Sequence, residues 1–325
     1  MPASALQKPR AAHGQRVAEF AQSVRAGFSK PQKELHSKYL YDELGSALFE
    51  AITHLPEYGL TRADERLLRE HAGEITDLIP APGAVIELGS GTGRKTRPIL
   101  AALRRRDPVR YFPIDVSSEA LARCERELSD IAQVHPQQQS YLDGMAAVTE
   151  DRRRDEPVLV LFLGSTIGNF ERSCALEFLR DLRSALQSGD SLLLGADLVK
   201  EPARMLEAYD DPTGVTAAFN LNLLGRVNRE LDADFELRNF EHQARWNEHE
   251  RRIEMHLASR VNQTASIPCC GLTVQFRTGE TIWTESSHKF LPEEMFVMAD
   301  RSGFRVQAQW VDRQWPFVES LWTAR

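Results

Sequence analysis

A glycine-rich run from Glu87 to Lys95, "ELGSGTGRK", has residue types that could hold a nucleotide-like ligand. A P-loop for ATP phosphates requires a glycine directly before its Lys-Thr pair, and Arg94 occupies that position. The dinucleotide spacing G-x-G-x-x-G also fails, because Gly93 comes one residue too early. The pattern that fits is E-x-G-x-G-x-G, whose glycines let the backbone pass close to a ligand at a strand's end.

Two aspartates follow the glycine run at positions where acids bind adenosine-type ligands. Asp115 closes the next expected strand, where a carboxylate can accept bonds from both ribose hydroxyls. A carboxylate at this position would suit NAD equally well, so Asp115 alone does not identify the ligand. Asp143 is expected to end the third strand, within reach of an adenine amino group. For either residue alone, turn formation is an equally good explanation, since Asp is common after strands.

The elements that position these residues alternate between strand and helix. Strands are expected at 84–88, 109–115, 138–144, 157–163 and 191–199, and helices at 96–106, 117–132 and 171–190. The strand within 157–163 is apolar on both faces, as in a buried parallel sheet. This succession predicts an α/β fold with a doubly wound parallel sheet.

The chain divides into five parts by pattern. Residues 1–15 are expected to be a loose N-terminus, and 16–74 a helical segment. Residues 75–200 form the α/β core. Residues 201–290 change from helices to a β-rich pattern and are expected to form a substrate-binding lid insertion. Residues 291–325, a helix and two strands, complete the core.

Composition narrows the function classes. The 325 residues carry a net charge of −7, which disfavours nucleic acid as a partner. No apolar run could span a membrane and no secretory signal precedes the core, so we expect a cytoplasmic protein. The four cysteines form no C-x-x-C pair and the nine histidines are scattered, so no metal site is expected.

The glycine motif resembles motif I of class I S-adenosylmethionine (SAM)-dependent methyltransferases. Longer segments resemble one family within that superfamily, the histidine-specific Nα-methyltransferases that form hercynine and begin ergothioneine biosynthesis. They include "KYLYDELGSALFEAITHLPEYGLTRAD" at 38–64, "FLGSTIGNF" at 162–170, "AYDDPTGVTAAFNLNLLGRVNREL" at 208–231 and "RIEMHLAS" at 252–259. The resemblance runs from about residue 25 to the C-terminus. It implies a Rossmann-like class I methyltransferase core with an additional α+β substrate-binding or lid domain.

The resemblance also implies a set of site residues, by position. It assigns the substrate pocket to Tyr58, Asn169, Tyr209, Met255, Glu285, Ser286 and Ser287, with Asn169, Tyr209 and Tyr58 as the residues that act in catalysis. It assigns cofactor binding to Tyr41, Glu87, Gly89, Gly91, Lys95, Asp115, Asp143 and Gly144. The sequence departs from the family pattern at Gly93, where some relatives have serine, and at Gly144, where a larger apolar residue is usual. The second departure concerns how tightly adenine fits.

Residue chemistry is compatible with the implied pocket. Glu285 and Ser287 alternate along an expected strand, so both side chains face one side and could engage one imidazole ring. From the pattern alone, however, a solvated strand is the better interpretation of Glu285, and only the resemblance reverses it.

The activity implied is SAM-dependent trimethylation of the α-amine of L-histidine, with the mono- and dimethylated forms as intermediates and S-adenosylhomocysteine (SAH) as by-product. The family implies a monomer that needs no metal. Three alternatives remain: an Nα-methyltransferase for another aromatic amino acid such as tryptophan, a nicotinamide-dependent oxidoreductase, and a partner-binding module with a degenerate cofactor site. Glu285 and Met255 favour histidine, and the glycine spacing disfavours the oxidoreductase.

Overall fold

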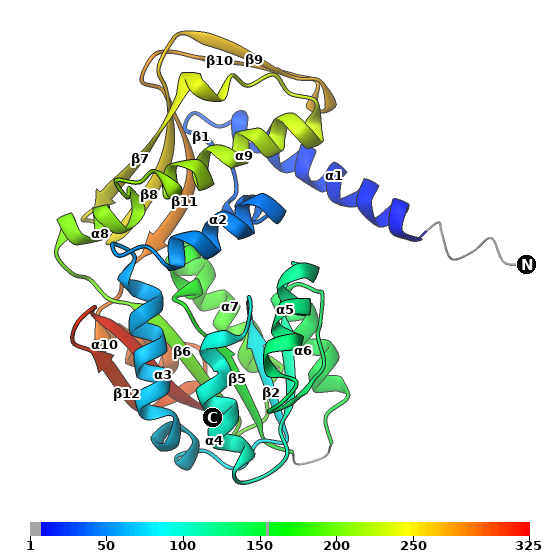
Figure 1. Ribbon diagram of the computed structural model, residues 1–325, viewed down its shortest axis with the longest axis vertical. Helices are drawn as coiled ribbons and strands as arrows, with labels where there is room; N and C mark the ends of the chain where they lie inside the picture. The colour runs from blue at the N-terminus through cyan, green and yellow to red at the C-terminus, as the bar shows by residue number, and fades with distance from the viewer. Residues whose placement is uncertain (1–7, 154–155) are drawn as a thin grey trace, which may run out of the picture. The chain divides into compact units, whose positions relative to one another are not determined.

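The computed structural model describes residues 8–153 and 156–325, which form two compact units (Figure 1). The first contains the described residues up to Glu57, together with Pro202–Asn247 and Ile253–Ser286. The second contains Tyr58–Glu201, Glu248–Arg252 and Ser287–Arg325. The chain therefore passes between the units several times, and each unit is assembled from segments that are far apart in sequence.

The second unit is built on a seven-stranded sheet of order β12-β13-β6-β5-β2-β3-β4. Its strands are β2 (Ala84–Leu88), β3 (Arg110–Ile114), β4 (Gln133–Val134), β5 (Val158–Phe162), β6 (Ser191–Asp197), β12 (Phe304–Asp312) and β13 (Phe317–Ala324). Strands β2 to β6 are parallel, as the sequence predicts, whereas β13 runs antiparallel to both β6 and β12. The order in which successive strands are added to the sheet reverses between β2 and β5, where a ligand crevice is expected in such sheets.

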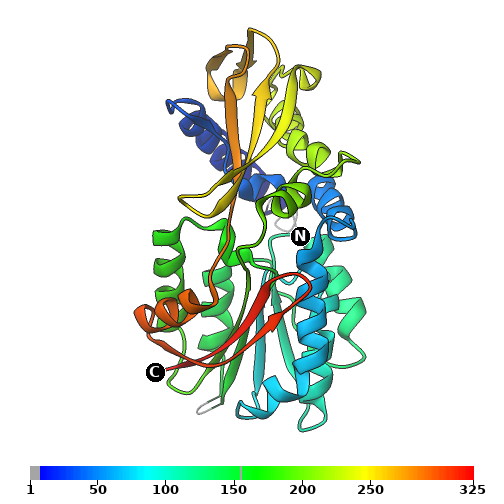
Figure 2. The same ribbon diagram turned by 90° about the vertical axis from the view of Figure 1, so that its left-hand side faces the viewer.

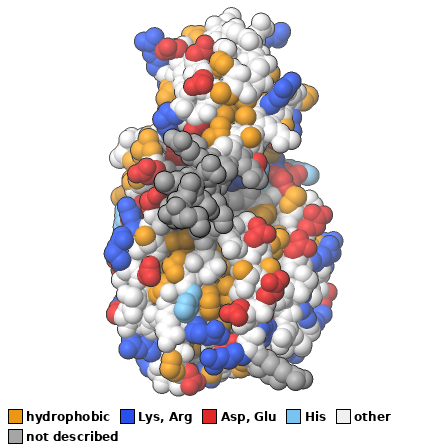
Figure 3. Space-filling view, turned by 90° about the vertical axis from the view of Figure 1, so that its right-hand side faces the viewer, with side chains coloured by type: hydrophobic (Ala, Val, Ile, Leu, Met, Phe, Trp, Pro, Cys, Tyr) orange, Lys and Arg blue, Asp and Glu red, His pale blue; other side chains and the backbone are white. Residues whose placement is uncertain are grey.

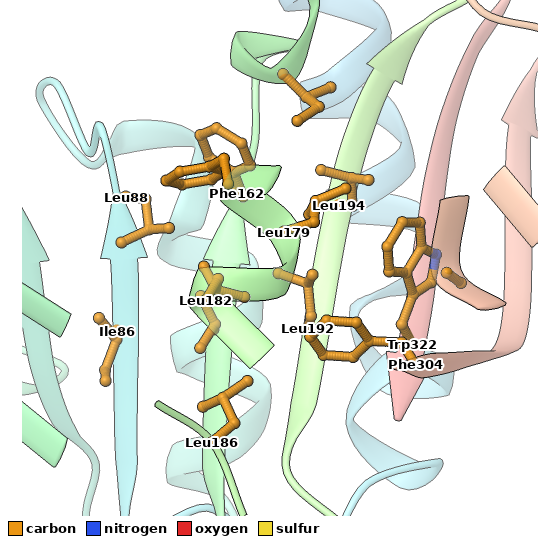
Figure 4. Close-up of a cluster of buried hydrophobic side chains, with 14 of the residues drawn as sticks. Ile86, Leu88, Phe162, Leu179, Leu182, Leu186, Leu192, Leu194, Phe304 and Trp322 are labelled. Atoms are coloured by element: carbon orange, nitrogen blue, oxygen red, sulfur yellow. The ribbon is translucent and has the colours of Figure 1, made fainter. Parts of the chain in front are cut away.

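Helices cover both faces of this sheet, and Figure 2 shows α3 and α10 on opposite sides. One face carries α3 (Gly59–Asp77), α4 (Arg97–Arg104) and α5 (Ser118–Leu128); the other carries α6 (Tyr141–Glu150), α7 (Arg172–Ser184) and α10 (Pro292–Arg301). Alternate strand residues pack into the two layers, so that Val85 joins one cluster and Ile86 the other. Figure 4 shows the second cluster, in which Leu179 and Leu182 of α7 pack on Phe162 and Leu192. Burial on both faces explains the apolar runs in these strands.

One expected strand of the core is wrong. Residues 138–144 do not form a strand ending at Asp143; helix α6 begins at Tyr141 instead. Ser140 caps this helix by accepting a hydrogen bond from the backbone N–H of Asp143, and Asp143 occupies the first turn. A serine followed three residues later by an acid is a helix-start pattern, and it outweighs the weak strand propensity of the run.

The first unit combines helices with a four-stranded sheet of order β1-β11-β8-β7 and a β9-β10 hairpin. Its helices are α1 (Lys8–Phe28), α2 (Glu43–Thr53), α8 (Pro202–Tyr209) and α9 (Val215–Leu231). Its strands are β1 (Lys33–Glu34), β7 (Phe240–Asn247), β8 (Arg252–Ser259), β9 (Gln263–Ile267), β10 (Leu272–Phe276) and β11 (Thr281–His288). The expected change from helices to strands after residue 200 is confirmed.

The N-terminal segment and the surface complete the description. Helix α1 begins at Lys8, earlier than the sequence pattern indicates, and residues 1–7 of the segment expected to be loose lie outside the described residues. Within the described chain, no helix is long and apolar enough to cross a membrane. On the face drawn in Figure 3, basic and acidic side chains are interspersed.

Candidate functional site

The glycine loop joins β2 to a short 3-10 helix, η2 (Arg94–Thr96), at the carboxyl end of the parallel strands. Gly89, Gly91 and Gly93 all have positive φ, at 73°, 52° and 71°. A β-carbon on Gly93 would lie 2.6 Å from the Cys124 sulfur of α5, so the loop is also packed tightly against that helix. A β-carbon on Gly91 would meet no atom within 4 Å. The loop therefore packs against α5 at Gly93 and leaves open space at Gly91.

Asp115 follows β3 and ties the glycine loop to the neighbouring strand. Its Oδ2 accepts the backbone N–H of Gly91 at 3.1 Å, and its Oδ1 accepts that of Ser117 at 2.9 Å. Burial raises the pKa of this carboxyl above its usual value, against the opposing effect of these backbone bonds. Each carboxylate oxygen can accept a further hydrogen bond. Asp115 thus supports the loop and keeps acceptor capacity for a ligand's hydroxyl groups.

Glu87 lies on β2, just before the glycine loop, and is completely buried. The family resemblance implies that Glu87 binds the cofactor, but its Oε2 accepts hydrogen bonds from the hydroxyls of Thr96, at 2.7 Å, and Tyr111. Its Oε1 is buried without a hydrogen-bond partner among the described residues. Burial raises the pKa of Glu87 to about 7, although both hydroxyls and the nearby Lys95 oppose the shift.

Lys95 is the cation of the site, and acids surround it. Its ammonium donates to Asp64 Oδ2 at 3.0 Å, and the same oxygen accepts the Gly164 N–H at 3.0 Å. Burial alone would lower the pKa of Lys95, but the attraction of Asp64 and Glu87 raises it. Glu319 of β13 is also fully buried beside Asp64, and burial together with that neighbouring acid raises its pKa well above the usual range. The Lys95 ammonium, held among these carboxyls at the carboxyl end of the strands, could bind a ligand carboxylate.

The residues expected at the adenine differ in their surroundings. Asp143 is exposed in the first turn of α6, where its side chain accepts a bond from the Ser140 hydroxyl at 2.6 Å. Gly144 is buried, and a β-carbon there would come within 2.7 Å of Ile114, which accounts for the small residue. Sequence reasoning missed Tyr141, whose hydroxyl would be 3.0 Å from a β-carbon on Gly89. The sequence signal for Tyr141 was its position directly after Ser140, which caps α6.

The second unit carries three of the expected substrate residues. Tyr58 is buried immediately before α3. Asn169 ends a 3-10 helix, η3 (Thr166–Asn169), which follows β5 through Ser165, a non-glycine residue with a positive φ of 58°. The Ser165 hydroxyl accepts the Asp197 N–H at 2.9 Å, and this bond holds the strained turn in place. Ser287, the third residue, is buried near the end of β11.

Strand β11 meets η3 within the second unit. A β-carbon on Gly168 would lie 2.8 Å from the His288 carbonyl oxygen, so only glycine permits this approach. The contact places the backbone next to Asn169 against the backbone next to Ser287. Two residues that the sequence analysis assigns to one pocket therefore come from elements that touch.

The first unit carries the remaining substrate residues. Met255 of β8 and Glu285 of β11 are buried on paired strands, which the Thr284 hydroxyl joins by donating to the Met255 carbonyl at 2.9 Å. Ser286, the next residue of β11, is half-buried. Tyr209 is buried at the end of α8, and its carbonyl accepts a bond from His242 at 2.7 Å.

Tyr41, expected at the cofactor, stands in an aromatic cluster of the first unit. Its ring centroid lies 5.5 Å from that of Phe49 and 5.6 Å from that of Phe219. Such edge-on contacts fix a ring's orientation. As for metals, no cluster of three or more His, Cys, Asp or Glu suited to an ion occurs among the described residues.

Comparison with known proteins adds three findings. A family model described as "Histidine-specific methyltransferase, SAM-dependent" matches residues 20–324. The chain is similar to the histidine N-alpha-methyltransferases of Mycolicibacterium smegmatis, at 44% identity, and of Mycobacterium tuberculosis, at 42%, with 92% of each chain covered in both comparisons. It is also similar, at 27% identity over 90% of this chain and 89% of the other, to the L-tryptophan methyltransferase trpM of Psilocybe serbica.

Proposed function

The chain belongs to the family of histidine-specific, SAM-dependent methyltransferases, and from this premise we propose that it methylates the α-amine of L-histidine three times to give hercynine. The observation that carries the proposal is the match of the family model over residues 20–324, which includes the glycine loop and every expected substrate residue. The two histidine N-alpha-methyltransferases that match over 92% of this chain support it. Hercynine formation would make this the first step of ergothioneine biosynthesis.

The residues of the second unit fit the cofactor. The open loop at Gly91 leaves space beside a strand end, Asp115 offers carboxylate oxygens to ribose hydroxyls, and Lys95 offers a cation to a carboxylate. When bound, SAM supplies an electrophilic methyl group and leaves as SAH. No metal is part of the proposal, since displacement at a sulfonium methyl by an amine needs no Lewis acid.

The chain's own residues would act mainly by positioning. Asn169 and Tyr209 would hold the amino and carboxylate groups of histidine, and Tyr58, Met255 and Glu285, with Ser286 and Ser287, would surround its ring. The attacking amine must be neutral, so its ammonium form must release a proton to water or a nearby acceptor before each transfer, and loss of solvation favours that release by lowering the amine's pKa. Holding two reactants in alignment can lower the activation barrier by roughly 7–11 kcal/mol. The proposal also places a monomeric enzyme in the cytoplasm.

Product analysis tests the proposal directly. The purified protein is incubated with SAM and an equimolar mixture of the amino acids, and products are identified by mass spectrometry. We expect histidine alone to gain up to three methyl groups. Methylation of tryptophan would instead support the alternative represented by the trpM relative and overturn the histidine assignment. Absence of any methylated amino acid would overturn the proposed activity.

A further inference from the structure

A buried cluster of charges adjoins the expected ring-binding residue Ser287. Lys289, two residues further along the chain, is completely buried. Its ammonium donates a hydrogen bond to the Ser287 hydroxyl oxygen at 2.9 Å and forms an ion pair with Asp197 Oδ2 at 2.8 Å. All three residues belong to the second unit. Burying a lysine is costly unless it is paired, so this arrangement holds the ammonium against one hydroxyl and one carboxylate.

Asp197 is itself held from several directions. Its Oδ1 accepts bonds from Lys200 at 2.6 Å and from the Trp315 indole N–H at 2.9 Å. Burial alone would raise the pKa of Asp197, but the two lysines lower it, so the carboxylate stays ionised. Because Lys200 and Trp315 would still bind Asp197 if Lys289 lost its charge, Lys289 is not needed to keep this carboxylate paired.

The backbone around Lys289 is fixed as firmly as its side chain. The Lys289 N–H donates to the Arg251 carbonyl at 2.7 Å, and Arg172 donates to the Lys289 carbonyl at 3.1 Å. The next N–H, of Phe290, donates to the Asp197 carbonyl at 2.9 Å. The backbone at the end of β11 and the charged side chain are thus both bonded to Asp197, which holds the ammonium beside Ser287.

An ammonium only donates, so the Ser287 hydroxyl must accept from Lys289, and its own proton points elsewhere. We propose that Lys289, anchored by Asp197, is a positioning and specificity residue that turns the Ser287 hydroxyl into a hydrogen-bond donor toward the substrate ring. A ring that satisfies this donor needs an unprotonated nitrogen. Neutral imidazole has one, whereas indole and imidazolium have only N–H groups. This inference rests on the proposed function, in which Ser287 contacts the imidazole.

The test uses the SAH-loaded enzyme, in which no turnover occurs, and ring-15N-labelled L-histidine. The wild type should bind histidine as one neutral tautomer, with one protonated and one hydrogen-bonded, unprotonated ring nitrogen in the NMR spectrum. Lys289→Met should raise the histidine Kd roughly tenfold, as expected for one hydrogen bond involving a charged network, and should abolish the single-tautomer signature. SAH affinity should not change, which shows that the variant is folded.

Three further variants separate the donor role from charge and from folding. Lys200→Met removes the other lysine from Asp197 and should leave histidine affinity close to that of the wild type. Lys289→Gln keeps an N–H donor without the charge and should retain the tautomer signature at least in part, even if Lys289→Met does not fold. Adding Lys289→Met to Ser287→Ala should cost no further affinity, because both act through one hydroxyl.

Several results would overturn the inference. Additive losses in the double variant, an equal loss in Lys200→Met, or a wild-type spectrum showing bound imidazolium would each contradict it. These results differ from failure of the proposed function, in which the wild-type enzyme neither binds nor methylates histidine.

Discussion

Glu87 is an acid in a strand whose five residues are all buried, and its energetics follow from that position. In water its carboxyl would ionise with a pKa of 4.5, but in the folded protein the pKa is about 7. Between these two values the folded state therefore holds a proton that the unfolded chain has released. Linkage then requires the free energy of unfolding to fall as pH rises from about 4.5 to about 7 and to stay lower above that range.

Replacing the acid by its neutral analogue should remove this dependence. We expect Glu87→Gln to increase the free energy of unfolding of the ligand-free protein at pH 8 by up to about 3 kcal/mol, and to have little effect at pH 4.5. Thermal or urea unfolding at several pH values between 5 and 8 would measure the difference. A gain that is the same at every pH would show that Glu87 is not the titrating group.

Glu285 gives a prediction about substrate recognition. Its carboxylate is the expected acceptor for an imidazole N–H, and it is buried, so loss of the side chain leaves the ring without that partner. We expect Glu285→Ala to raise the KM for histidine by roughly 10- to 100-fold, corresponding to a charge-assisted hydrogen bond. Steady-state kinetics would measure this. The matched control is Glu280→Ala, one residue before β11, whose carboxylate pairs with Lys33 instead; equal effects of both variants would refute the assignment.

At the scale of elements, the glycine loop packs closely against α5. A β-carbon at Gly93 would lie 2.6 Å from Cys124 and 2.7 Å from Leu128, at a φ of 71°. Gly93→Ala should therefore destabilise the protein by roughly 2–4 kcal/mol, through backbone strain and overpacking together. Gly189→Ala, at a φ of 92° but with open space, should show the strain component alone. Urea unfolding of both would separate the two, and equal losses would exclude the packing explanation.

The helices and strands also show which parts of the fold could be predicted from the local sequence and which could not. The strand around Val160 was predictable because apolar residues run through it without interruption, and the strand around Ile86 because β-branched and apolar residues lead into the glycine loop. The start of α6 was missed because its capping signal at Ser140 was outweighed by an expected strand–helix rhythm. The direction of β13 was not predictable, since periodicity identifies a strand but does not say which neighbour it pairs with. Glu319 and Lys289 escaped notice because a single charged residue on or next to a strand gives no sign of its partners.

At the scale of the whole molecule, the pattern predicted a separate segment at 201–290, but not that this segment would pack with residues before Tyr58 in one unit. The first unit joins three chain segments, and local periodicity carries no information on which distant segments pack together. The residues from Glu87 to Asp115 could be grouped from sequence because they lie along a regular strand-and-helix succession, whereas Asp143 and Gly144 were expected on a strand and lie on helix α6. The substrate residues were accessible only through family resemblance, because each has an ordinary structural explanation when taken alone.

Ligand binding should stabilise the whole chain. At a SAH concentration 100 times its Kd, mass action adds about 2.7 kcal/mol to the free energy of unfolding, which should raise the Tm by several degrees. Calorimetry with and without SAH would measure the shift. Asp115→Ala should show little shift at the same concentration, because it removes both the loop support and the ribose acceptor. A full shift in this variant would show that Asp115 does not contribute to binding.

The position of β13 has a consequence for the chain as it is being made. Glu319 lies over Gly195 of β6, where a β-carbon would come within 2.8 Å of its carboxyl oxygen, so β13 closes one side of the buried acid group. Yet β13 begins at Phe317, about 120 residues after β6 ends at Asp197. At a translation rate of about 5–20 residues per second, β6 would wait roughly 6 to 24 s for its partner. During that interval the edge of β6 that β13 later covers stays unpaired, and unpaired strand edges are prone to aggregation.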